Sequence, residues 1–175
     1  RSSIPDNFNN QMFGFQMVGP DICGFGGNTN PELCARWFQL GALYTFARDH
    51  NDADSISQEP YALGDIVLQA AKKNLKLRYS LLKYFYLQFL NKRGLGSIWR
   101  PLFFEFPLDA NTYFDEIADT QFLVGPNVLV TPILEPGSFV GFAFQRLDDH
   151  EDGDVDPYLI FAPNGNGLYT GSRTS

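Results

Sequence analysis

Two polar loops carry residue types that together could bind a sugar. Asp21 and Phe25 follow the apolar run 12–19, which is predicted to be a buried strand. Arg48 and His50 follow the next predicted strand. In a parallel α/β barrel, the loops after neighbouring strands meet at one end of the barrel. A carboxylate and an imidazole can hydrogen-bond the hydroxyl groups of a hexose, and an aromatic ring can cover its apolar face.

Each of these side chains also has a purely structural interpretation. Asp21 would accept backbone N–H bonds in a turn, where Asp is common. Phe25 would pack in the core, and His50 would be an ordinary surface residue of a loop. Arg48 would form an internal salt bridge with one of two acidic neighbours, Asp49 and Glu59.

The predicted elements follow the order strand, loop, helix, strand, loop, helix, which is typical of a parallel α/β protein. The first strand is expected at 12–19 and the second at 43–47, although 43–47 could also end the preceding helix. These elements must position the two loops.

Two helices are predicted between and after the strands. The first begins near Pro31, which suits the first helical turn, and Thr29 and Glu32 have capping-box spacing. Its apolar face is expected at intervals of four, three and four residues: Leu33, Trp37, Leu40 and Tyr44. The second helix is expected over about 65–91, ended by Gly94. Part of its buried stripe is Ala70, Leu77, Leu81 and Tyr84.

The pattern changes after Arg100. Residues 100–107 are predicted to be extended and are punctuated by prolines, and 128–134 is predicted to be a strand. From about residue 121, turn residues separate short apolar runs, which favours an all-β region. We therefore expect an α/β unit over residues 1–120 and a β domain over 121–175.

Composition excludes several classes of partner. The net charge of −7 argues against nucleic-acid binding, because such proteins need clustered Lys and Arg. No apolar run approaches the ~20 residues that span a bilayer. The chain starts at Arg1 without an initiator Met or the apolar stretch of a signal peptide, so we expect a fragment or a processed chain.

No metal or cofactor is predicted. The acidic stretch 148–156 fails the helix-loop-helix calcium template, since His150 would take its third position and Leu159 its twelfth. A solvated acidic loop is the better interpretation. Cys23 and Cys34, the only cysteines, lack the further ligands of a metal site. They could be two buried thiols or a disulfide that stabilises the fold by roughly 2–3 kcal/mol, and their spacing leaves both open.

Several segments resemble glycoside hydrolase family 31. Residues 17–25, Met-Val-Gly-Pro-Asp-Ile-Cys-Gly-Phe, are similar to the family segment V-G-A-D-I-C-G-F. Residues 29–42 look like T-x-x-E-L-C-x-R-W-x-Q-L-G-A, and residues 46–51 look like F-S-R-N-H-N. Three further segments keep the family's order: 58–61, 77–82 and 100–107. The resemblance covers roughly residues 3–139, and several long motifs in register are far more specific than one.

The resemblance implies the last strands and helices of a (β/α)8 barrel, followed by part of a β-sandwich domain. It implies a retaining, exo-acting α-glucosidase that removes terminal glucose from α-linked oligosaccharides. Phe25 would line the pocket for that glucose and His50 would hydrogen-bond its hydroxyl groups, with Asp21 and Arg48 supporting the pocket. Cys23 and Cys34 match a disulfide of secreted and lysosomal members. An extracellular, lysosomal or other secretory compartment is therefore implied.

The catalytic carboxylates are expected outside this chain. Retaining glycosidases use two carboxylates about 5–5.5 Å apart. The nucleophile motif of the family, W-x-D-M-N-E, does not occur in residues 1–175, and the acid/base precedes the part represented here. The chain would thus supply pocket loops and work with the missing N-terminal part or a companion chain, being inactive alone.

Other functions remain open at this level. The main alternative is a non-catalytic carbohydrate-binding or interaction polypeptide derived from the same family. A third possibility lies within the family: another α-glycoside specificity, such as that of an α-xylosidase, or the lyase reaction on α-glucans. The sequence also departs from the family pattern at Pro20, Asp49 and Lys83, where Ala, Asn and Pro are usual, and after Phe139 the expected strand pattern is not recognisable.

Overall fold

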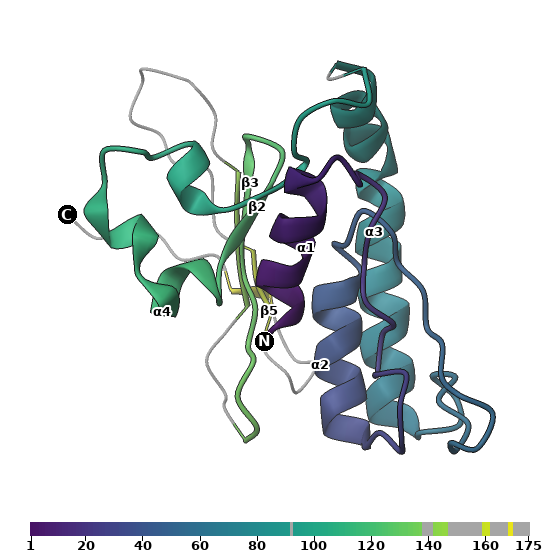
Figure 1. The fold of residues 1–175 in the computed structure, drawn as a ribbon. Helices are drawn as coiled ribbons and strands as arrows, with labels where there is room; N and C mark the ends of the chain where they lie inside the picture. Colours follow the sequence, from purple (N-terminus) through teal and green to yellow (C-terminus); the bar gives the residue numbers. More distant parts are fainter. Residues whose placement is uncertain (92, 138–141, 147–158, 162–167, 170–175) are drawn as a thin grey trace. The chain divides into compact units, whose positions relative to one another are not determined.

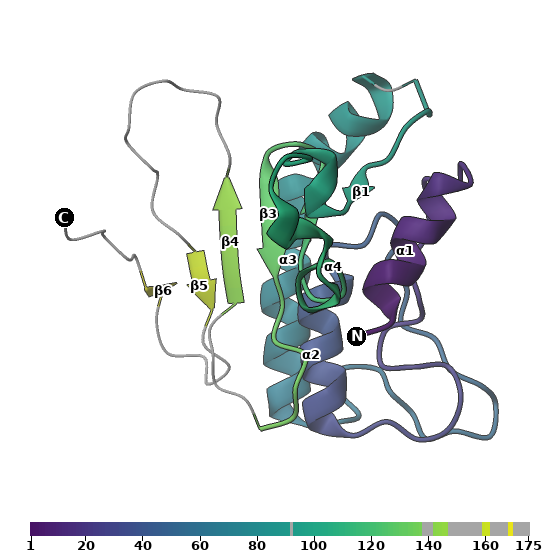
Figure 2. The same cartoon turned by 60° about the vertical axis from the view of Figure 1, so that its left-hand side comes forward.

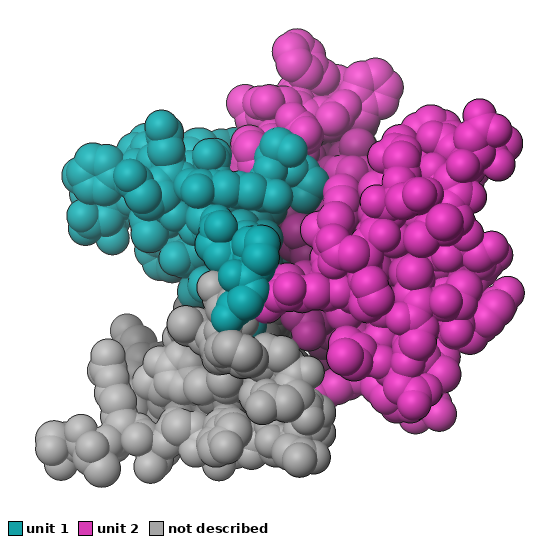
Figure 3. All heavy atoms as spheres, turned by 90° about the horizontal axis from the view of Figure 1, so that it is seen from below, with its two compact units in different colours: residues 1–4, 100–175 teal, residues 5–99 magenta. Residues whose placement is uncertain are grey.

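The computed structural model describes the chain except for residues 92, 138–141, 147–158, 162–167 and 170–175. It divides into two compact units, coloured separately in Figure 3. The helical unit comprises residues 5–99, and the sheet unit comprises residues 1–4 and 100–175. The predicted domain boundary at residue 120 stays a prediction. The acidic stretch 148–156 lies outside the described residues.

Three helices dominate the first part of the chain: α1 (Ser3–Met12), α2 (Pro31–Gly41) and α3 (Asp65–Asn91). Helices α2 and α3 lie side by side (Figure 1). Their buried side chains include Phe38 of α2 and Val67 and Phe85 of α3. Among the described residues, no helix is both long and apolar enough to cross a membrane.

The bounds predicted for α3 are confirmed, and Pro31 begins α2 as expected. The predicted capping box is wrong, because the cap is Asn30, whose Oδ1 accepts a hydrogen bond from the Leu33 N–H at 3.0 Å. The predicted apolar face of α2 is only partly right. Leu33 is exposed and Tyr44 lies beyond the end of the helix, while Cys34 and Gly41 face inward, toward the segment around Ile22.

The two predicted strands, 12–19 and 43–47, are not regular strands. Met12 is the last residue of helix α1. This helix was not predicted from the sequence, although Pro5 and Asp6 are typical of a first helical turn. Phe13, in the segment predicted to be buried, is 83% exposed. A parallel strand is stable when neighbouring strands and helices cover it, and among the described residues no third strand lies beside this pair.

Parallel pairing of the two segments nevertheless survives over a short stretch. The Phe46 N–H donates to the Val18 carbonyl at 3.2 Å, and the Ile22 N–H donates to the Arg48 carbonyl at 2.8 Å. Gly19 permits this approach, because a Cβ at that position would lie 1.9 Å from the Phe46 carbonyl oxygen. The stretches that lead into the two loops are thus held together backbone to backbone.

A buried glutamine links distant parts of the helical unit. Gln11 of α1 accepts hydrogen bonds at Oε1 from the backbone N–H groups of Ile98 and Trp99, both at 2.8 Å. Its Nε2 donates to Thr45 Oγ1 at 3.3 Å. The ring of Trp99, which is fully buried, lies 5.4 Å from that of Tyr44.

The sheet unit confirms the predicted β region. Two short 3-10 helices and a one-turn α-helix precede most of the sheet: η1 (Leu102–Phe104), η2 (Ala110–Tyr113) and α4 (Asp115–Ala118). Because η1 lies within 100–107, the extended conformation predicted there holds only in part. The strands are β1 (Trp99–Arg100), β2 (Phe122–Val124), β3 (Val128–Thr131), β4 (Phe142–Arg146), β5 (Leu159–Phe161) and β6 (Leu168–Tyr169). From β2 onward each strand pairs antiparallel with the next one in the chain (Figure 2).

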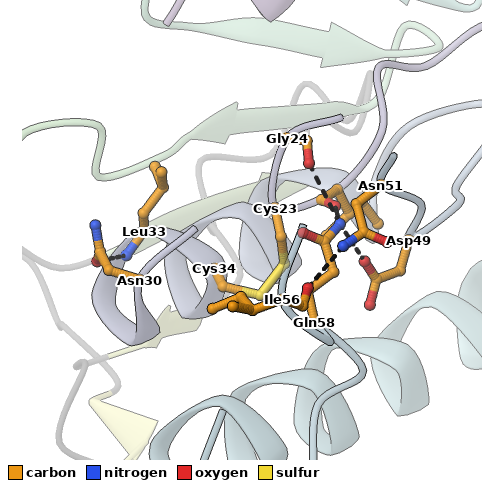
Figure 4. The surroundings of a disulfide bond; sticks show 10 residues. Cys23, Gly24, Asn30, Leu33, Cys34, Asp49, Asn51, Ile56 and Gln58 are labelled. Atoms are coloured by element: carbon orange, nitrogen blue, oxygen red, sulfur yellow. Dashed lines mark hydrogen bonds between the residues drawn. A yellow bond between two sulfur atoms is a disulfide. The ribbon is translucent and has the colours of Figure 1, made fainter. Parts of the chain in front are cut away.

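A disulfide joins Cys23 to Cys34, as the sequence resemblance implied (Figure 4). Both residues are buried, and their Cα atoms are 4.4 Å apart. Cys23 has a φ of 71°, a left-handed conformation that non-glycine residues adopt at a cost. The bond therefore fastens a strained turn to helix α2.

Replacing Cys23 and Cys34 together by Ala is expected to lower the free energy of unfolding by roughly 2–3 kcal/mol, because the bond closes a short loop that restricts the unfolded chain. Urea unfolding monitored by circular dichroism measures the change. Dithiothreitol should shift the wild-type midpoint and leave that of the double variant in place. Equal midpoints for the two proteins without reductant would contradict a stabilising bond.

Candidate functional site

Two neighbouring loops bring all four predicted sugar-binding residues together. The first loop (residues 21–28) carries Asp21 and Phe25, and the second loop (residues 48–58) carries Arg48 and His50. The rings of Phe25 and His50 are 5.4 Å apart between centroids, with their planes inclined by 43°. Both residues are exposed, Phe25 by 50%. The pair thus offers an aromatic face and an imidazole side by side to the solvent.

Asp21 and Arg48 form an ion pair between the loops. Arg48 Nη2 lies 2.7 Å from Asp21 Oδ1, and Arg48 Nε donates to the same oxygen at 2.8 Å. The acidic partner of Arg48 is therefore Asp21, rather than Asp49 or Glu59. The guanidinium also lies over the ring of Phe46, 5.6 Å from its centroid. The geometry fits a role in holding the loops in place.

The backbone fixes the loops beneath these side chains. Ile22 and Asp49 form a parallel bridge. The Asp52 N–H donates to the Phe25 carbonyl at 3.0 Å. Phe25 and His50 are therefore attached to backbone that is paired on either side of them, so the spacing of their rings does not depend on side-chain contacts alone.

A second network joins the outer parts of the loops. Asp52 Oδ1 accepts hydrogen bonds from Ser55 Oγ at 2.8 Å and from the Asp54 N–H at 3.0 Å, while Oδ2 accepts one from the Gly27 N–H at 3.4 Å. These bonds, the one from Ser55 most of all, lower the pKa of Asp52. Asn28 Oδ1 accepts a hydrogen bond from the Ile56 N–H at 2.9 Å.

Gln58 connects the inner parts of the loops, as Figure 4 shows. Its side chain is buried, and Nε2 lies within hydrogen-bonding distance of the Ile22 carbonyl (3.1 Å), the Gly24 carbonyl (3.3 Å) and Asp49 Oδ1 (3.0 Å). Sequence reasoning assigned no role to Gln58. Its only signal was a place in the family-like segment 58–61.

Asp49 is a partly buried carboxylate between the two loops. Burial raises its pKa, and the hydrogen bond from Gln58 works in the opposite direction. Glu59 and Asp21 raise the pKa further by charge repulsion, while His50 lowers it. The carboxylates of Asp21, Asp49 and Asp52 all serve to hold the loops.

Within the part of the chain that the structure describes, no cluster of His, Cys, Asp and Glu could hold a metal ion.

Two domain families match the chain. The Glycosyl hydrolases family 31 TIM-barrel domain matches residues 1–88, and the Glycosyl hydrolase family 31 C-terminal domain matches residues 96–145. Helices followed by a small antiparallel sheet agree with this order, which confirms the predicted fold class: the tail of the barrel and the start of the C-terminal β domain.

Several named α-glucosidases are similar in sequence to most of this chain. It is 49% identical to the lysosomal acid alpha-glucosidase of Tetrahymena pyriformis, over 75% of this chain and 14% of that protein. It is 48% identical to the lysosomal alpha-glucosidase of Rattus norvegicus, over 77% of this chain and again 14% of the relative. The chain thus spans about one seventh of the length of these relatives.

Solved structures give the same family. A Flavobacterium johnsoniae GH31 dextranase complexed with glucose superposes with a TM-score of 0.72 at 29% identity, covering 81% of this chain and 18% of that one. A family 31 alpha-glucosidase from Bacteroides thetaiotaomicron gives a TM-score of 0.66 at 31% identity, covering 79% and 24%. On these matches of sequence and fold, the chain belongs to glycoside hydrolase family 31, with α1, α2 and most of α3 within the TIM-barrel match and β1, β2 and β3 within the C-terminal-domain match.

Proposed function

We propose that this chain supplies the substrate-pocket loops of a retaining, exo-acting α-glucosidase that removes terminal α-linked glucose from oligosaccharides. The observation that carries the proposal is the exposed pair of Phe25 and His50, 5.4 Å apart on two interlocked loops. The phenyl ring can cover the apolar face of a glucose unit, and the imidazole can hydrogen-bond its hydroxyl groups. The ion pair between Asp21 and Arg48 keeps the two loops in register.

The bond-breaking carboxylates come from other polypeptide. A retaining mechanism needs one carboxylate to attack the anomeric carbon and another to protonate the leaving oxygen. In the two loops, Asp21 is bound to Arg48, and Asp49 is bound to Gln58. The nucleophile motif of the family does not occur in residues 1–175, so we expect this chain to bind and orient the substrate while the chemistry occurs on carboxylates of other polypeptide.

Exposed apolar faces support a further polypeptide partner within the same enzyme. Along α3, the exposed residues Tyr79, Leu82, Tyr86 and Leu90 recur at intervals of three, four and four and so share one face of the helix. Phe13, directly after α1, is also largely exposed. Soluble proteins rarely leave such stripes uncovered, so the rest of the barrel is the natural cover.

A secretory compartment accords with the disulfide and with the lysosomal relatives. Disulfides such as Cys23–Cys34 persist in oxidising environments outside the cytosol. Two similar proteins, from Tetrahymena pyriformis and Rattus norvegicus, are lysosomal alpha-glucosidases. We therefore place the enzyme in the secretory pathway, in an extracellular, lysosomal or related compartment.

The isolated chain of residues 1–175 is expected to show no hydrolysis of a chromogenic α-glucoside above the rate without enzyme, because both catalytic carboxylates are absent. Release of nitrophenol from nitrophenyl α-glucoside measures the activity. The complete protein that carries this chain serves as the positive control. Turnover by the isolated chain at ordinary enzyme rates would contradict the division of roles. An inactive complete protein that still binds maltose would favour a non-catalytic carbohydrate-binding polypeptide.

Replacing His50 by Ala in the complete enzyme is expected to lower kcat/KM about tenfold or more, since a hydrogen bond to a glucose hydroxyl is lost in a site built to make it. Steady-state kinetics on maltose measures the effect. The matched control is His150→Ala, which removes the other histidine of the chain and should leave kcat/KM unchanged. Wild-type kinetics in the His50→Ala variant would remove this imidazole from the pocket.

A further inference from the structure

Gln58 has a buried side chain whose carboxamide contacts both loops of the site. It comes from the far end of the second loop and returns to the first, where the carbonyls of Ile22 and Gly24 accept from Nε2. The same nitrogen donates to Asp49 Oδ1. All three partners are acceptors, so the amide nitrogen, rather than the amide oxygen, must face them.

Two of the three contacts of Gln58 lie one residue away from a ring of the site. Gly24 precedes Phe25, and Asp49 precedes His50. The bonds from Gln58 to the Gly24 carbonyl and the Asp49 carboxylate therefore restrain the residues next to the two rings. Gly24 itself has a φ of 93°, next to the left-handed Cys23, so this turn needs support from outside its own sequence.

The oxygen of the same carboxamide lacks a donor within the described part of the chain. Gln58 Oε1 is buried, and none of the described residues donates a hydrogen bond to it. A buried acceptor without a donor is costly, so a donor placed at this atom would stabilise the site. The carboxylate of Asp49 already contacts the nitrogen of this carboxamide, and its protonated form would carry an O–H.

We propose that Gln58 and Asp49 form a proton-dependent clasp that sets the spacing between Phe25 and His50, with Gln58 as a positioning residue for sugar binding. With Asp49 ionised, the clasp consists of the bond from Gln58 Nε2 to Asp49 Oδ1. With Asp49 protonated, its O–H also donates to Gln58 Oε1, so that carboxylic acid and carboxamide are joined by two hydrogen bonds. The inference rests on the proposed role of the two loops as a sugar pocket.

The surroundings of Asp49 raise its pKa and so extend the protonated form to higher pH than in an exposed Asp. Burial is the largest cause that raises the pKa of Asp49, and the negative charges of Glu59 and Asp21 add to it. His50 opposes them, and Arg48 is engaged by Asp21. Because the folded state binds this proton more tightly than the unfolded chain does, the contribution of Asp49 to stability is largest at acidic pH. It falls as pH rises from the ordinary value of 3.8 through the raised pKa of the folded state.

Two variants of the complete enzyme test different parts of the proposal. Asp49→Asn tests the role of the proton, and Gln58→Ala tests the role of the hydrogen bonds that Gln58 makes. An Asn amide can donate to Gln58 Oε1 at every pH, so Asp49→Asn should match the wild type at acidic pH. At neutral pH it should bind glucose severalfold more tightly and melt at a higher temperature than the wild type. Gln58→Ala should weaken glucose binding about tenfold at both pH values, because the loops lose the clasp altogether.

Gln11→Ala is the matched control for Gln58→Ala. Gln11 is an equally buried glutamine with several hydrogen bonds, but it lies outside the two loops. Its loss should lower the melting temperature while leaving glucose affinity and its dependence on pH unchanged. A role of Gln58 in stability alone would make the two variants alike, and that result would overturn the proposal. So would identical pH profiles of glucose binding in Asp49→Asn and the wild type.

Hydrogen exchange distinguishes an error in the proposed clasp from an error in the proposed sugar pocket. Gln58→Ala should speed exchange of the Ile22 and Asp52 amide hydrogens without any sugar present, since both bridge the loops. If exchange there is unchanged, the clasp is wrong whatever the sugar data show. If exchange speeds up while His50→Ala binds glucose like the wild type, the clasp exists but the loops are not a sugar pocket, and the positioning role is overturned with the proposed function.

Discussion

The short parallel pairing between residues 18–22 and 46–49 is the contact on which the rest of the site depends. Two backbone hydrogen bonds, from Phe46 to Val18 and from Ile22 to Arg48, bring the loop that carries Phe25 beside the loop that carries His50. Gly19 makes this approach possible, because any side chain there would collide with the neighbouring backbone. Without the pairing, the aromatic ring and the imidazole would have no fixed distance between them.

The helices carry the paired segments. The disulfide fastens Cys23 to α2, and Arg78 of α3 donates hydrogen bonds to the carbonyls of Ala42, Tyr44 and Thr45, which precede the second loop. Burial lowers the pKa of Arg78, yet an arginine remains charged in proteins, so these carbonyls keep a cationic partner. Each loop is thus attached to one of two helices that pack against each other, and this packing supports the spacing that the parallel pairing sets.

The fold was predictable where one local signal dominates. Helix α3 has a long apolar periodicity and a glycine soon after its end, so its bounds follow from the sequence. The antiparallel strands after residue 121 also follow from short apolar runs between turn residues. The segment 12–19 misled the prediction because an apolar run becomes a strand only when neighbouring strands cover it, and a cover cannot be inferred from the run itself. The N-cap of α2 was missed because Thr29 and Asn30 are adjacent capping residues, and only the backbone decides between them.

By itself the sequence determined the family pattern, the change from a helix-containing region to a β region, and the four residues Asp21, Phe25, Arg48 and His50 that the structure brings onto adjoining loops. The disulfide was implied by the family resemblance alone. The partner of Arg48 and the use of Gln58 were decided only by the tertiary structure. The groups that Gln58 contacts stand as far as 36 residues away along the chain. The role of a carboxamide depends on which acceptors the fold brings within hydrogen-bonding distance. Residue type and spacing along the chain do not specify those acceptors.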